Sequence, residues 1–292
     1  MVLSAITTAV LLGIASAYMA GAVHSSRLGR PVRAARWVPF AAGWLVLVIA
    51  LLTPLDGAAD RSFTAHMAQH LLLTFVAPPL LALGAPISLA LGALAPGSAR
   101  GLARALRSPV VSLLAHPVVG WGLFVGVPVA LHASRVFDLA LGSAGWHADE
   151  HAAWVGAALV YWWPIVGVDP SPHPMGYGAR LLSLLLAMPA MSFLALTIYS
   201  ADAPLYAIYA AQPGALTDQR DAAALMWVAG NLALVVSMLL VAASWKRHDD
   251  EAQRRLEARE DAARARSEAS EGDRLSSLPS SRGRRSSSPR RR

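Results

Sequence analysis

Two histidine pairs have a spacing that can bind a metal ion. His66 and His70 lie four residues apart in HMAQH, and His147 and His151 lie four residues apart in HADEH. On a helix this spacing puts both imidazoles on one face, with Cβ atoms roughly 5 to 6 Å apart. Each pair can therefore share one metal ion or meet ligands from a neighbouring helix. A fifth histidine, His132, precedes His147 by only fifteen residues, so a short connection returns it near the second pair.

Acidic and sulfur-containing side chains accompany these histidines. Glu150 lies inside the second pair, and Asp218 and Asp221 open the last apolar segment. Such carboxylates either cap a helix N-terminus or accept a hydrogen bond from a metal-bound imidazole. Met67 and Met226 are weaker candidates, because thioether with imidazole favours copper but methionine in an apolar helix usually packs. The chain has no cysteine, so His, Met, Asp or Glu must hold any metal.

The composition predicts an all-α, polytopic membrane protein. Hydrophobic residues make up 55% of the 292 residues and charged residues 15%, with a mean hydropathy of +0.45. A bilayer core needs roughly 20 apolar residues per helix, which predicts seven transmembrane helices. The predicted spans are residues 2–23, 37–55, 65–84, 110–132, 147–168, 180–200 and 222–245. The first lacks a preceding basic segment and is interpreted as a retained helix, and residues 85–96 as a continuation of the third span or a re-entrant stretch.

Arginine positions predict the orientation of these spans. The loops richest in arginine are 24–36, with Arg27, Arg30, Arg33 and Arg36, and 85–109, with Arg100, Arg104 and Arg107. Short loops rich in arginine stay in the cytoplasm, which places the N-terminus outside and the C-terminus inside. The five histidines and the acidic start of the last helix then share the outer level.

The predicted domain boundary lies at residue 245. Residues 1–245 are expected to form a seven-helix transmembrane domain, and residues 246–292 a charged cytoplasmic tail that is largely disordered. Within the tail, residues 246–270 could extend the seventh helix into the cytoplasm, whereas 271–292 has almost nothing to bury. The tail is rich in serine and arginine and has no aromatic residue to stack on bases. We therefore expect it to contact anionic lipid headgroups, not nucleic acid.

Four stretches together resemble a known family. They are HMAQHLLLTFVAPPLLALGAP, His132 followed by VFDLAL, WHADEHAAWVGAALVYWWPIVG, and DQRDAAALMWVAG. Between about residues 35 and 245 the chain resembles the CtaG family of integral-membrane, caa-type cytochrome c oxidase assembly factors. The family's histidine positions fall on the five histidines above, and its acidic opening of the last helix on Asp218 and Asp221. Leu131 stands where many relatives carry an aromatic residue.

The resemblance implies a multi-pass protein of the bacterial plasma membrane that is needed for active cytochrome c oxidase. It implies copper handling at the outer face, with oxidase subunits or copper chaperones as partners. Two other functions stay open from the residues: a haem-binding electron carrier, with histidines of separate helices as axial ligands, and a membrane transporter. HADEH also matches the H-x-x-E-H zinc-protease pattern, but no third ligand motif accompanies it. We therefore do not expect an enzyme.

Overall fold

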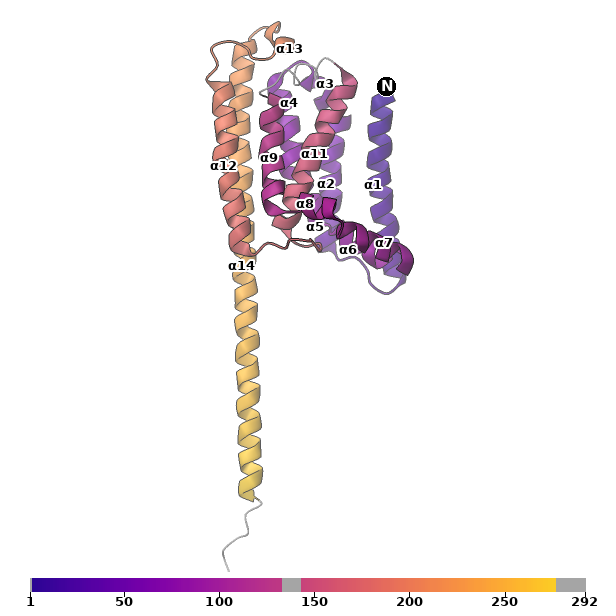
Figure 1. The fold of residues 1–292 in the computed structure, drawn as a ribbon, viewed down its shortest axis with the longest axis vertical. Helices are drawn as coiled ribbons and strands as arrows, with labels where there is room; N and C mark the ends of the chain where they lie inside the picture. Colours follow the sequence, from indigo (N-terminus) through magenta and orange to yellow (C-terminus); the bar gives the residue numbers. More distant parts are fainter. Residues whose placement is uncertain (1, 133–142, 277–292) are drawn as a thin grey trace, which may run out of the picture. The chain divides into compact units, whose positions relative to one another are not determined.

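The computed structural model describes residues 2–132 and 143–276, and these residues form helices and no strands (Figure 1). The helices are α1 (Val2–Arg27), α2 (Ala34–Leu52), α3 (Pro54–Ala59), α4 (Phe63–Leu71), the π-helical turn η1 (Leu72–Val76), α5 (Ala77–Leu83), α6 (Pro86–Ala93), α7 (Pro96–Leu106), α8 (Pro109–Leu114), α9 (Pro117–His132), α11 (Ala144–Val166), α12 (Tyr177–Tyr199), α13 (Ala207–Ala210) and α14 (Ala215–Ser276). The predicted all-α class is confirmed.

Several helices can cross a membrane. Among the described residues, five helical stretches are long and apolar enough: Ala5–Arg27, Ala34–Leu52, Phe63–Ala93, Tyr177–Tyr199 and Ala215–Arg266. The other two predicted spans are also helical, but α9 has 16 residues, and α11 begins with histidines and carboxylates that lower its hydropathy. The chain is a multi-pass membrane protein.

A pair of prolines shapes the third span. Pro78 and Pro79 have no N–H, so the carbonyl of Thr74 can accept neither an α-helical nor a π-helical bond. The indole Nε1 of Trp162 on α11 donates to that carbonyl at 2.8 Å. A neighbouring helix thus satisfies a backbone group that the prolines left open, and the bond ties α11 to the helix that carries His66 and His70.

Small residues let the neighbouring helix approach. A Cβ atom on Gly43 of α2 would lie 2.9 Å from the carbonyl oxygen of Ala77 and the nitrogen of Leu81 on α5. Only glycine fits such a contact, which is typical of helix packing in membranes. Residues 85–96, expected to continue the third span or to re-enter, begin with a break in the helix: Ala85 adopts the left-handed region at φ 51°, and α6 begins at Pro86.

The last helix is longer than the predicted span. Contacts divide the chain into residues 1–242 and 243–292, and α14 continues to Ser276. Residues 246–276 are helical, which agrees with the expectation that residues 246–270 could extend the seventh helix. They are rich in alanine, glutamate and arginine, which favour helix, and Arg255 pairs with Glu251 one turn away at 3.3 Å. The rest of the tail, 277–292, lies outside the described residues.

Candidate metal centre

The first histidine pair lies near the start of α4. The hydroxyl of Ser62 caps this helix by accepting from the N–H of Ala65. Asp218 of α14 adds its carboxylate: Oδ2 accepts from the N–H of Phe63 at 2.6 Å, and Oδ1 from the N–H of Thr64 at 3.2 Å. Three of the N–H groups that a helix start leaves without intrahelical partners are thereby satisfied. These contacts fix the turn from which His66 projects.

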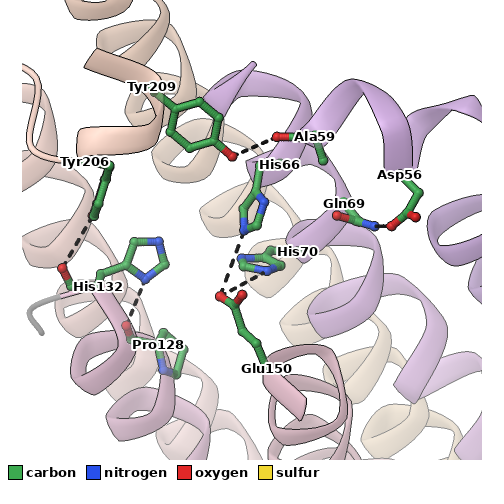
Figure 2. Close-up of polar contacts among 10 residues, drawn as sticks. All are labelled: Asp56, Ala59, His66, Gln69, His70, Pro128, His132, Glu150, Tyr206 and Tyr209. Atoms are coloured by element: carbon green, nitrogen blue, oxygen red, sulfur yellow. Dashed lines mark hydrogen bonds and ion pairs between the residues drawn. The ribbon is translucent and has the colours of Figure 1, made fainter. Parts of the chain in front are cut away.

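Glu150 of α11 faces both histidines of α4. Its Oε1 lies 3.6 Å from Nε2 of His70 and 3.9 Å from Nε2 of His66 (Figure 2). These distances exceed those of hydrogen bonds. They suit a shared ion, because atoms each about 2.0 to 2.2 Å from one metal are separated by roughly 3 to 4 Å in tetrahedral coordination.

His147 completes a group of three ligands. One ligand atom from each of His66, His147 and Glu150 lies within 4.8 Å of the other two. The i, i+3 spacing of His147 and Glu150 puts both on the face of α11 that is turned to α4. Imidazole nitrogen with carboxylate oxygen is a donor set that zinc and copper accept.

The other predicted histidines lie around this group. Within each pair the ring centroids are close: 4.2 Å for His66 and His70, and 4.3 Å for His147 and His151. The ring of His70 also lies 5.8 Å from that of His151 and 6.3 Å from that of His132. Nδ1 of His132 lies 2.9 Å from the carbonyl oxygen of Pro128, which orients its ring. The structure brings all five together from α4, α9 and α11.

The centre is buried. His66 is 0% exposed and Glu150 3% exposed. Both ring nitrogens of His70 are buried without a hydrogen bond among the described residues, and the buried carboxylate of Glu150 interacts with the side chain of Trp154 and the two histidines of α4. Buried polar groups nearly always have a partner, and an unpaired carboxylate is costly to bury. A bound cation would take one ring nitrogen of His70 and neutralise the carboxylate of Glu150, so these residues fit a metal.

Aromatic residues that the sequence analysis did not single out enclose the centre. Trp154 stacks on His70 with ring centroids 4.2 Å apart. Above His66, the hydroxyl of Tyr209 on α13 donates to the carbonyl of Ala59 at 2.7 Å (Figure 2). Burial raises the pKa of Tyr209, so it stays neutral. Aromatic residues in a membrane protein usually indicate interfacial belts, so the sequence alone does not show that these two enclose the metal centre.

Gln69, between the two histidines of HMAQH, is also buried and polar. Its Nε2 donates to the carbonyl of Ala50 at 2.8 Å and to Oδ1 of Asp56 at 2.9 Å (Figure 2). These bonds join α4 to α2 and α3. The sequence contains a signal for this contact between helices: a single amide side chain in an apolar helix must form a hydrogen bond to a neighbouring helix.

Four other predicted candidates have contacts that do not point to a ligand role. The hydrogen bonds of Asp218 go to the start of α4, and Asp221 is exposed. Met67 and Met226 lie in a buried apolar cluster formed with Phe63 and residues of α12 and α14. Their surroundings are those of packed core residues.

Fold and site together define a multi-pass helical membrane protein with a buried histidine and glutamate cluster between its helices. The chain matches the family model of the cytochrome c oxidase caa3 assembly factors, Caa3_CtaG, over residues 16–248. It belongs to this family, and the resemblance found in the sequence is confirmed.

Curated proteins of mycobacteria are similar to this chain. Uncharacterized protein ML1998 of Mycobacterium leprae is 29% identical over 255 residues, which cover 83% of this chain and 38% of that protein. Uncharacterized protein Mb0105 of Mycobacterium bovis is 26% identical over 261 residues, which cover 85% of this chain and 39% of that protein. The chain thus spans less than two fifths of these relatives. No solved structure matches it.

Proposed function

We propose that the chain holds copper transiently at the cluster of His66, His70, His147 and Glu150 and thereby supports the maturation of cytochrome c oxidase. The observation that carries this proposal is the group of buried His66, half-buried His147 and buried Glu150, with ligand atoms within 4.8 Å of one another. Copper and zinc both accept this donor set. The family's part in oxidase assembly favours copper, which the oxidase itself contains.

The proposal includes seven spans in the bacterial plasma membrane, with the N-terminus outside and the C-terminus in the cytoplasm. The arginine-rich connections favour this orientation: one follows α1, and the other contains α7. The start of α4 and the start of α11 belong to the opposite end of the bundle. The copper centre then faces the outside, where copper chaperones or an oxidase subunit would exchange the ion, while basic residues of the tail contact anionic lipid.

The experiment is a copper titration of the full chain purified in detergent. We expect about one Cu(II) per chain in the unmodified protein, and loss of high-affinity binding in the His66→Ala, His147→Ala double variant. Glu150→Gln keeps the shape of the side chain and removes its charge, so its affinity should fall by about tenfold or more. The matched control is His24→Ala, because His24 is an exposed histidine of α1.

Equal copper stoichiometry and affinity in all four proteins would refute the copper centre. The haem alternative has its own readout in the same preparation. A Soret band that disappears with His70→Ala would favour a haem carrier over copper handling.

A further inference from the structure

A cavity of about 690 Å³ lies between α1, α2, α3 and α11. Apolar side chains of α1 and α2 line one part of it. The rest is lined by polar residues where α3 follows α2 and where α11 begins, including Asp56, Asp60, His147 and His151. Two carboxylates of the connection between the second and third spans and two imidazoles of α11 thus face one space. Ionisable groups that line a cavity of a membrane bundle are usually functional.

His151 gives an independent sign that this space receives a ligand. The residue is 8% exposed, lines the cavity, and has a buried Nε2 without a hydrogen bond among the described residues. His147 lines the same cavity and also belongs to the ligand group with His66 and Glu150. His147 therefore lines the cavity and belongs to the metal centre, and its imidazole can bind a metal ion.

We propose that this cavity is the entrance through which a divalent metal cation reaches the buried centre. Asp56 and Asp60 attract the cation at the mouth, His151 passes it to His147, and His147 stays bound while His66 and Glu150 replace the earlier ligands. At each step one metal–ligand bond forms as another breaks, water leaves the ion, and its charge does not change. Carboxylate and imidazole suit Cu(II) better than Cu(I). This inference rests on the proposed copper centre.

The mouth is held in a fixed relation to the centre. Asp56 accepts from Nε2 of Gln69, whose neighbours on α4 are the two histidines of the first pair (Figure 2). A carboxylate fixed at the rim of a partly apolar cavity focuses the field on an approaching cation and raises its association rate. Asp60 is exposed and lines the same cavity, so it meets the cation first.

Gly57 offers a way to close the entrance without touching a ligand. It lies in α3, lines the cavity, and a Cβ atom built on it would meet no heavy atom within 4 Å. Gly57→Phe therefore fills cavity space without a backbone clash. Gly156→Phe is the matched control: Gly156 lies on α11, its Cβ would also meet nothing within 4 Å, and it is exposed outside the residues that line the cavity.

The test follows Cu(II) association with the full chain by stopped flow. For Gly57→Phe we expect association and dissociation to slow by about tenfold or more, with stoichiometry and Kd near those of the unmodified protein. An entrance changes the height of the barrier and leaves the bound state as it was. Gly156→Phe should bind at the unmodified rate.

A second variant keeps the test decisive if Gly57→Phe folds poorly. Asp60→Asn should slow association by about tenfold at low ionic strength and converge on the unmodified rate in high salt. Asp221 is an exposed carboxylate that does not line the cavity, so Asp221→Asn should leave the association rate unchanged. If Gly57→Phe and Asp60→Asn bound Cu(II) at the rates of the unmodified protein, the proposed entrance would be wrong and the proposed copper centre would be unaffected. Absence of Cu(II) binding by the unmodified protein would overturn both.

Discussion

Asp218 is the carboxylate whose removal should most directly disturb the helix that carries the first histidine pair. It belongs to α14, yet it accepts hydrogen bonds from the N–H groups of Phe63 and Thr64 and from the hydroxyl of Ser62. The change Asp218→Ala removes all three hydrogen bonds at once. It also removes a negative charge from the positive end of the α4 dipole.

The size of the effect follows from these contacts. Loss of a helix cap typically costs about 1 kcal/mol, and hydrogen bonds to a charged group contribute about 1.5 to 3 kcal/mol each. Asp218 is half-buried, so water replaces part of what is lost, and we expect a net destabilisation of about 2 kcal/mol. In a chain of this size that lowers Tm by about 4 to 8 °C.

A thermal melt and a copper titration in the same detergent measure the two consequences. His66 lies one turn from the capped end of α4, so fraying of that turn should also weaken copper binding by about tenfold. The control is Asp221→Ala, three residues along α14, where the carboxylate is exposed. If Asp218→Ala melted and bound copper like Asp221→Ala, the assignment of Asp218 as the support of α4 would be refuted.

Two further predictions concern the bundle and its orientation. Trp162→Phe leaves the carbonyl of Thr74 without its donor and puts a smaller ring at a fully buried position, which together should cost at least about 1 to 3 kcal/mol. A Tm equal to that of the unmodified protein would contradict this. Because the chain has no cysteine, Ser98→Cys and Gln212→Cys give single labelling sites on α7 and after α13. In intact cells an impermeant maleimide should label Gln212→Cys alone; labelling of Ser98→Cys alone would reverse the orientation.

Much of the candidate site was predictable because its signals are local. The i, i+4 spacing of HMAQH and HADEH puts each pair on one helix face whatever the tertiary structure, and the structure does bring the two pairs together. Glu150 was expected to support an imidazole, and its position 3.6 Å from His70 makes it a ligand candidate as well. The assignment of these residues as metal ligands stays a prediction.

Other parts of the site were not predictable because they depend on long-range contacts. Asp218 bonds to residues about 155 positions away in the chain, and no spacing rule connects them. Met67 is one residue from His66 but turns into the apolar cluster, since neighbours on a helix face different directions. The turn with Tyr209 reaches the site through a bond to Ala59, 150 residues earlier.

The sequence by itself determined that this is a helical membrane protein of the CtaG family with two histidine pairs on helix faces. Apolar run length and residue spacing are properties of the local chain, and they survive in any arrangement of the helices. The tertiary structure decided which faces meet. The bond from Trp162 of α11 to the carbonyl of Thr74, which the prolines at 78 and 79 leave open, ties α11 to the helix of the first histidine pair. In this arrangement His66, His147 and Glu150 have ligand atoms within 4.8 Å of one another.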